Sequence, residues 1–338
     1  MPKVSRLARL FLIGFTAIAI APSAKAWGCK GHQAIALIAE IHMTPHARQV
    51  AMQILHASPI DPTLARYCGQ SGLDPFADAS TWPDDIRKLR PETPPWHFID
   101  IPRGAPKSDI AKYCPPSTSC VTRALTEQVR VLRDPGSTAQ AKADALRLII
   151  HFVGDIHQPL HAITNNDMGG NCVPVTFFGQ APEGPPGRRL VEPGGSIESV
   201  PGSGSFHPNL HSIWDTDIIE HFSPGQSSTQ LASSLDQKFD SQIFAWQKEP
   251  ANFDDWAWES HQLAESTAYG KLPHPLAIET PRAVSACVDP ADPTSHDRLL
   301  KIDENLGDDY QNASTPVVEE QLAKAGARLA ALLNSVWQ

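Results

Sequence analysis

The stretch IIHFVGDIHQPLHA, residues 149–162, joins an apolar helical pattern to histidine and aspartate side chains, which are residue types that bind metal ions. Apolar residues recur at helical spacing from Ala139 onward, so the pattern predicts a helix over Ala139–Val153. His151 and Asp155 are four residues apart. They therefore lie on one face of the helix, where an imidazole nitrogen and a carboxylate oxygen reach a common point, as a zinc ion requires.

A third candidate metal ligand, His161, lies ten residues after His151. On a continuous helix the two side chains would point roughly 80° apart. Pro159 lies between them and is expected to kink the helix. We therefore expect His161 to be turned toward a second, neighbouring ion.

The segment NLHSIWD, residues 209–215, repeats the first spacing with His211 and Asp215 on another helical pattern. One such pair is more often an exposed ion pair or hydrogen bond than a metal site. Two pairs in apolar helices favour metal binding, because burying an aspartate and a histidine without a partner is costly.

Two more segments offer ligand-type side chains in apolar surroundings. STWPDDIR, residues 80–87, contains Asp84 at a predicted helix start, and WHFID, residues 96–100, contains His97 and Asp100. The structural alternatives are a first-turn or N-cap acid for Asp84 and a core histidine for His97.

Helical patterns dominate the rest of the chain, which predicts an all-α fold with a single domain over residues 27–338. A strand pattern at Val173–Phe178 adds a minor β-hairpin. Residues 180–208 are rich in Gly, Pro and Ser and predict a long loop. The predicted helices are Gln33–Leu55, Thr122–Leu132, Ala139–Val153, Leu210–Phe222, Leu231–Trp246, Phe253–Tyr269 and Thr315–Trp337, the last with Thr315 as N-cap and Pro316 in its first turn.

Residues 1–26 have the pattern of a secretory signal peptide: a basic start, a short apolar run and the cleavage motif Ala24-Lys25-Ala26. Cleavage would make Trp27 the first residue and would place the protein outside the cell or in the periplasm. Six cysteines then suit an oxidising compartment. Cys114 and Cys120 enclose a short loop and are the expected local pair, whereas the pairing of the other four stays open.

The chain without residues 1–26 is acidic, with 24 basic and 37 acidic side chains and a formal charge of −13. Such a charge argues against binding nucleic acid through a basic patch and against docking on an anionic membrane. No apolar run after residue 26 is long enough to span a bilayer.

The start of the predicted mature chain, WGCKGH over residues 27–32, completes a recognisable series. The order WGCKGH, STWPDDIR, WHFID, HFVGDIHQPLH, GGN and NLHSIWD resembles the S1/P1 nucleases of the zinc-dependent phospholipase C/P1 nuclease superfamily. The resemblance covers almost all of residues 27–338. It implies that superfamily's all-α fold.

The resemblance also implies three zinc ions, each with its own ligands. One ion would be held by Asp84, His97, His151 and Asp155. A close partner would be held by the α-amine and carbonyl of Trp27, with His32 and Asp155, and the third by His161, His211 and Asp215. Three Zn²⁺ ions would bring the charge of the mature chain from −13 to −7 and concentrate positive charge in one cleft, so the acidity does not exclude a nucleic-acid substrate.

By the same resemblance, the activity would be hydrolysis of single-stranded DNA and RNA to 5′-phosphorylated products, together with 3′-nucleotidase activity. Asp155, Arg87 and Asp100 would serve catalysis, with Arg87 holding phosphate. The implied nucleoside pocket is formed by Phe98, Asp100, Met168, Gly170 and Asn171. A surface ion pair for Arg87 and core positions for Phe98 and Met168 are the structural alternatives.

Two other functions are compatible with parts of the sequence. A zinc phospholipase C shares the superfamily, but that branch has Glu at the position of Asp215 and a longer interval between its first Trp and the next His than Trp27 to His32. A non-catalytic secreted metal- or nucleotide-binding protein would not need so complete a ligand set. We expect a monomer without a stable protein partner, acting on single-stranded nucleic acid and 3′-nucleotides. The loop 180–208 is longer than in typical fungal or plant members.

Overall fold

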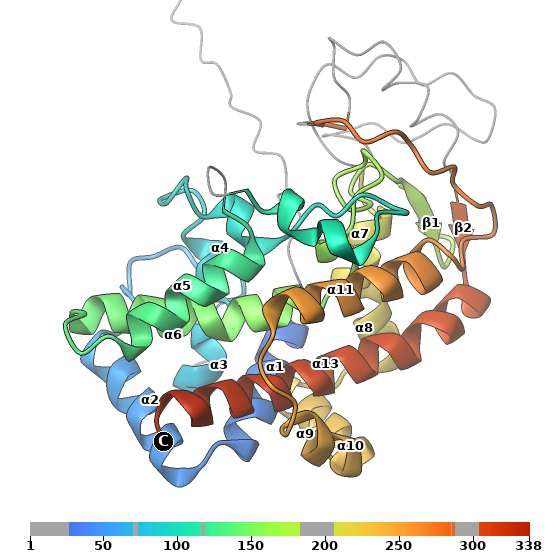
Figure 1. The fold of residues 1–338 in the computed structure, drawn as a ribbon. Coiled ribbons are helices and arrows are strands. Elements are labelled where there is room, and N and C mark those ends of the chain that lie inside the picture. Colours follow the sequence, from blue (N-terminus) through green and yellow to red (C-terminus); the bar gives the residue numbers. More distant parts are fainter. Residues whose placement is uncertain (1–26, 70–73, 116–118, 183–205, 285, 288–303) are drawn as a thin grey trace, which may run out of the picture.

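Helices make up nearly all of the regular structure in the described part of the chain (Figure 1). The computed structural model describes residues 27–338 except 70–73, 116–118, 183–205, 285 and 288–303. The predicted signal peptide and most of the predicted loop 180–208 lie outside the described residues. The α-helices are α1 (Cys29–His42), α2 (Pro45–Ala57), α3 (Pro75–Ala79), α4 (Trp82–Asp85), α5 (Val121–Arg133), α6 (Ala139–Ile156), α7 (Leu210–Ser212), α8 (Ile218–Phe222), α9 (Ser228–Lys238), α10 (Asp240–Trp246), α11 (Phe253–Leu263) and α13 (Asp308–Val336).

Short helical turns and two strands connect these helices. The 3₁₀ turns are η1 (Pro94–His97), η2 (Lys107–Tyr113) and η3 (Pro159–Ala162), the π-helical turns are η4 (Ile213–Asp217) and η5 (Ala264–Ala268), and the strands are β1 (Val175–Phe177) and β2 (Glu304–Leu306). The all-α fold class is therefore confirmed.

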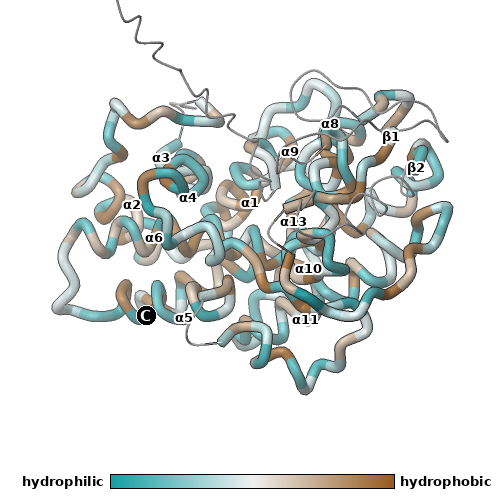
Figure 2. The backbone as a smooth tube through the Cα atoms, turned by 90° about the horizontal axis from the view of Figure 1, so that it is seen from above, coloured by the Kyte–Doolittle hydropathy of each residue, from teal (hydrophilic) through white to brown (hydrophobic). Residues whose placement is uncertain are grey.

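The core forms where α13 packs along α1 and where α5 packs along α6 (Figure 1). Buried apolar residues recur along each helix, and Figure 2 shows this as hydrophobic and hydrophilic bands along the same helices. The C-terminal half of α6 is buried without interruption from Ala145 to Ile156. This central helix is thus held on all sides, which fixes the direction of every side chain in its last turns.

Gly326 lets α13 approach α1 closely. A Cβ at this position would lie 2.5 Å from Cγ2 and 2.6 Å from Cβ of Ile38. Gly326→Ala is therefore expected to destabilise the protein by about 1–3 kcal/mol through overpacking, which exceeds the gain of at most ~1 kcal/mol in helix propensity. Urea unfolding of the two proteins measures the difference.

Gly307→Ala is the matched control for this substitution. A Cβ at Gly307 would have no neighbour within 4 Å among the described residues. Because Gly307 is the N-cap of α13, where Gly is favoured over Ala, its effect should be a loss of at most about 1 kcal/mol. A Gly326→Ala protein as stable as the wild type would contradict the close contact between α1 and α13.

Two helix boundaries differ from the predictions. The pattern over Gln33–Leu55 belongs to two helices, because Thr44 caps α2 by accepting a hydrogen bond from the Ala47 amide at 3.1 Å and Pro45 starts that helix. The last helix begins at Asp308, so Thr315 is not its N-cap. The Thr315 hydroxyl instead accepts a hydrogen bond from Nε2 of Gln311 at 2.8 Å, within the helix.

The predicted strand exists, but its main pairing is with a distant segment and not within a β-hairpin. β1 pairs in parallel with β2, with Val175 opposite Glu304 and Phe177 opposite Leu306. Parallel pairing requires a long connection rather than a tight turn. The local turn at Phe178 and Gly179, both with positive φ, brings Gln180 back to a single antiparallel bridge with Phe177, so only the tip of the predicted hairpin forms.

Three disulfides tie the loops to the helices. Cys114–Cys120 confirms the predicted pair, and the structure adds Cys29–Cys68 and Cys172–Cys287. The set fits an extracellular or otherwise oxidising compartment. Within the described ranges, none of the helices is both long and apolar enough to cross a membrane.

Candidate metal centre

Three groups of ligand-type side chains lie close together, each with its candidate ligand atoms within 4.8 Å of one another. We call them the first, second and third groups. The first is His32, His151 and Asp155, the second is Asp84, His97 and His151, and the third is His161, His211 and Asp215. Eight of the nine predicted metal ligands are thereby brought together, the exception being the backbone of Trp27.

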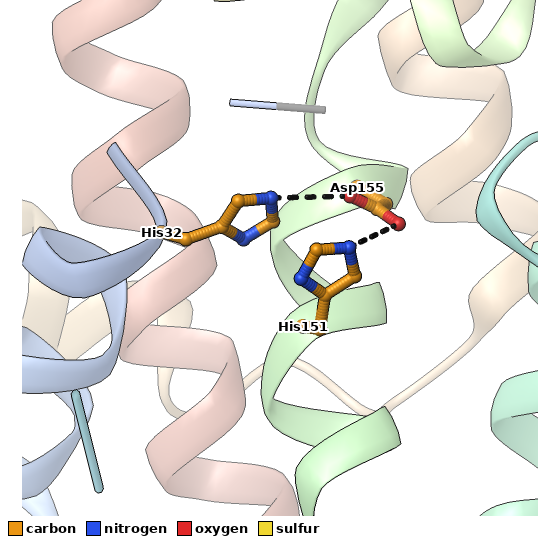
Figure 3. A group of neighbouring side chains, drawn as sticks. All are labelled: His32, His151 and Asp155. Atoms are coloured by element: carbon orange, nitrogen blue, oxygen red, sulfur yellow. Dashed lines mark ion pairs between the residues drawn. The ribbon is translucent and has the colours of Figure 1, made fainter. Parts of the chain in front are cut away.

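The first group is centred on the carboxylate of Asp155 (Figure 3). Oδ2 lies 3.2 Å from Nε2 of His151, one turn earlier on α6, and Oδ1 lies 3.4 Å from Nε2 of His32 on α1. Both Asp155 and His151 have no exposed surface. Gly154 makes room for His32, because a Cβ there would lie 2.8 Å from Nδ1 of that ring.

The second group adds side chains from two short turns. Nδ1 of His97, at the end of η1, lies 2.9 Å from Oδ2 of Asp155. Oδ1 of Asp84, in α4, lies 3.9 Å from Nδ1 of His97 and equally far from Nε2 of His151. Asp84 is indeed a first-turn acid, and it also faces the cluster.

The third group joins η3 to the helix that runs from Leu210. Pro159 begins η3, so the chain turns after α6 as predicted, and this turn carries His161. The rings of His161 and His211 lie 5.0 Å apart, and Nε2 of His211 lies 3.4 Å from Oδ2 of Asp215. The π-helical turn η4 contains Asp215, and such turns are frequent at functional sites.

Backbone carbonyls orient three of the histidines. In each of them Nδ1 donates a hydrogen bond to a backbone carbonyl. The His151 ring donates to Ser80 (2.6 Å), the His161 ring to His97 (2.8 Å) and the His211 ring to Gly169 (2.7 Å). Such bonds fix the tautomer and leave Nε2 free to bind an ion. Sequence analysis missed them, because a carbonyl acceptor has no residue type by which it could be recognised.

The electrostatics favour ligand forms of the histidines. Burial lowers the pKa of His32 and His97 to about 4 and that of His211 to about 3, so these rings are neutral and have a lone pair at neutral pH. Burial also acts on His151, but the carboxylates of Asp155 and Asp84 outweigh it and raise the pKa of this ring to about 9. A cation would take the place of that proton.

The unsatisfied atoms of the cluster fit bound cations. In the part of the chain that the structure describes, both oxygens of Asp155, Nε2 of His32 and Nε2 of His211 are buried without a hydrogen-bond partner. Leaving such atoms unpaired costs about 1–3 kcal/mol each. Imidazole and carboxylate donors without thiolate suit zinc, manganese or iron.

The predicted ninth ligand, Trp27, lies at the edge of this cluster. Its side chain is fully buried. The next residue, Gly28, donates its amide hydrogen to the backbone carbonyl of Asp215 at 2.6 Å. The start of the predicted mature chain is thus held beside the third group, and metal binding by its α-amine stays a prediction.

The predicted catalytic groups outside the ligand set lie nearby. Nη1 of Arg87 is 3.3 Å from Oδ1 of Asp84. This is the ion pair weighed as an alternative, but it lies at the cluster, and the charge on Arg87 helps to lower the pKa of His97. Asp100 keeps an exposed surface, yet partial desolvation and the charge on Asp167 raise its pKa to about 6.

The predicted nucleoside-pocket residues share one loop, apart from Phe98 and Asp100. Met168 is 40% exposed, which contradicts a core position for it, and has a φ of 56°, while Gly170 has a φ of 83°. Nδ2 of Asn171 donates to the Met168 carbonyl at 2.8 Å. Phe98 is half-buried. Asp100 interacts with Asp167, the neighbour of Met168, and therefore lies near this loop.

The helical fold and the three groups of histidines and aspartates have the chemistry of a metal-binding protein. Residues 27–338 match the model of the S1/P1 Nuclease family. The chain belongs to the S1/P1 nuclease family and is therefore a hydrolase that cleaves phosphodiester bonds.

Curated relatives agree over almost their full lengths. The chain is 29% identical to endonuclease 3 of Arabidopsis thaliana, over 92% of this chain and 89% of that protein. It is 26% identical to nuclease S1 of Aspergillus oryzae, over 97% of this chain and 98% of that protein. It is also 26% identical to nuclease P1 of Penicillium citrinum, over 92% and 97%.

Proposed function

We propose that this protein is a secreted or periplasmic zinc nuclease that cleaves single-stranded DNA and RNA to 5′-phosphorylated products and removes 3′-phosphate from nucleotides. The observation that carries the proposal is the presence of three groups of ligand-type side chains, two of which contact the buried carboxylate of Asp155, while the third lies close enough for its histidines to be influenced by that charge. Names of relatives, such as nuclease S1, support the nucleic-acid substrate.

Each group would hold one zinc ion. The ion at the second group would be held by Asp84, His97, His151 and one oxygen of Asp155. The ion at the first group would be held by His32, the other oxygen of Asp155 and the backbone of Trp27. The ion at the third group would be held by His161, His211 and Asp215. Zinc bound in this way lowers the pKa of water and neutralises phosphoryl oxygens.

The protein's own side chains would position the substrate. Arg87 lies beside Asp84 and offers a planar pair of N–H donors, which match the geometry of a phosphate. Phe98 would stack on a base, and Asp100 would hydrogen-bond its edge. Stacking favours single strands, because an unpaired base leaves its π-face open to the protein.

A panel of substrates tests the proposal. Protein that begins at Trp27 is given denatured DNA, RNA, duplex DNA, a 3′-nucleotide and phosphatidylcholine. We expect single strands to be cut much faster than duplex, 5′-phosphates on the products, and release of phosphate from the 3′-nucleotide. A chelator should abolish each activity, and zinc should restore it.

The other outcomes are equally informative. Hydrolysis of phosphatidylcholine without hydrolysis of nucleic acid would identify a phospholipase C. A protein that binds metal and hydrolyses none of these substrates would be a metal- or nucleotide-binding protein. Activity that survives exhaustive chelation would contradict the metal centre.

A further inference from the structure

Gln158 is a buried residue in the segment HFVGDIHQPLH, residues 151–161, and the proposed function gives it no role. It lies two residues after the end of α6, at the N-cap of η3, and has no exposed surface. Its amide forms two hydrogen bonds in opposite directions. Oε1 accepts from the Leu160 amide at 2.5 Å, and Nε2 donates to Oδ1 of Asp215 at 2.6 Å.

These two bonds join the two segments that supply the third group. The bond to Leu160 caps η3, the turn that presents His161. The bond to Asp215 reaches η4, which is more than fifty residues further along the chain. One neutral side chain therefore bridges η3 and η4.

The bond also determines which oxygen of Asp215 faces the histidines. Oδ1 is occupied by the amide of Gln158, whereas Oδ2 lies 3.4 Å from Nε2 of His211. A buried carboxylate without this donor would have two equivalent oxygens and freedom to rotate. Only a group that both donates and accepts can cap η3 and hold Asp215 together.

We propose that Gln158 is the positioning residue of the third group: it holds Asp215 so that a single oxygen, Oδ2, is presented to an ion together with His161 and His211. The inference rests on the proposed function, because it concerns the ion in that group. It assigns Gln158 no contact with the ion or with the substrate.

The test measures how many zinc ions are bound and how tightly. Gln158→Met keeps the length of the side chain and removes both hydrogen bonds. We expect the affinity for one of three ions to fall by about 10- to 100-fold, the usual loss when an outer partner of a ligand is removed. The other two ions should keep their affinity. Zinc titration of metal-free protein and zinc content after dialysis give both values.

Two further variants are measured beside Gln158→Met, one as an alternative to it and one as a control. Gln158→Asn keeps an amide but is one methylene shorter, so it cannot span Leu160 and Asp215, and the same selective loss is expected if the Met variant fails to fold. Ser260→Ala is the matched control, because Oγ of Ser260 donates to the Ile156 carbonyl at 2.6 Å near the same helix end, also without exposed surface. It should bind three ions normally.

The outcomes separate the inference from the proposed function. Wild-type protein with three ions and a Gln158 variant with three equally tight ions would overturn the positioning role alone. Equal weakening of all three ions in the Gln158 variants would also overturn it, because that pattern indicates general loss of structure. Wild-type protein with fewer than three ions would overturn the proposed metal centre, and this inference with it.

Discussion

Replacing Asp155 with Asn is expected to lower kcat/KM on denatured DNA by about 1000-fold or more, a loss of about 4 kcal/mol in transition-state stabilisation. The reason is that one carboxylate faces two groups. Oδ2 lies 2.9 Å from His97 and Oδ1 lies 3.4 Å from His32. The Asn amide has no charge and only one oxygen. It would turn an N–H donor toward one of the two groups, where the proposed ion needs an oxygen ligand.

Zinc content measured beside the rate distinguishes a lost ligand from a lost catalytic charge. We expect the Asp155→Asn protein to retain less zinc than the wild type after dialysis. Asp254→Asn is the control for a loss of carboxylate charge, because Asp254 is an exposed acid in the first turn of α11. Its rate should change by less than about threefold, as for surface substitutions. Full zinc content and a wild-type rate in Asp155→Asn would refute the shared ligand.

Local spacing explains why so much of the centre was predictable. His151 and Asp155 lie within one helix, as do His211 and Asp215, so the period of the helix brings each pair to one face before any tertiary contact forms. Pro159 has an equally local effect, because it ends α6 and starts the turn that carries His161. The resemblance to a family then favoured the ligand role over the structural alternatives for Asp84 and His97 and added His32.

Long-range partners were not predictable from local patterns. β1 shows a strand pattern, but nothing in it indicates that its partner is Glu304–Leu306 in parallel. Cys29 and Cys172 likewise gave no sign of pairing with Cys68 and Cys287. The selection of partners depends on how the helices pack, so it follows from the fold.

Even a strong local signal depends on its surroundings. Thr44-Pro45 starts a helix, and the Thr44 hydroxyl caps it. Thr315-Pro316 has the same two residues but lies inside α13, where the Thr315 hydroxyl is bound by Gln311. Gly307 and two aspartates have already started that helix about two turns earlier. The dipeptide predicts a helix start only where no helix precedes it.

Adding one residue before Trp27 is expected to lower zinc binding at the first group and to reduce the rate by about 100-fold or more, a loss of about 2.7 kcal/mol. The proposed ligand is the α-amine, whose ordinary pKa near 7.7–8.0 lets a metal displace its proton close to neutral pH. An added residue converts this amine to an amide, whose nitrogen has no available lone pair.

The surroundings of Trp27 leave the chain no alternative arrangement. Its side chain is fully buried, and Gly28 is bound to the Asp215 carbonyl at 2.6 Å. A Cβ at Gly31 would lie 2.9 Å from Cβ of Trp27, so the next turn of α1 packs against it closely. A longer chain therefore cannot slide inward to place a new amine at the same point.

A removable extension provides the sharpest measurement. Protein with a protease site ending directly before Trp27 is assayed before and after cleavage, with zinc present in both cases. We expect cleavage to restore both the missing zinc and the rate, whereas a residue added after Gln338 should change neither. An uncleaved protein with full zinc content and a full rate would show that the α-amine is not a ligand. Recovery on cleavage would mean that the protein needs a free α-amine at Trp27, which the predicted removal of residues 1–26 would provide.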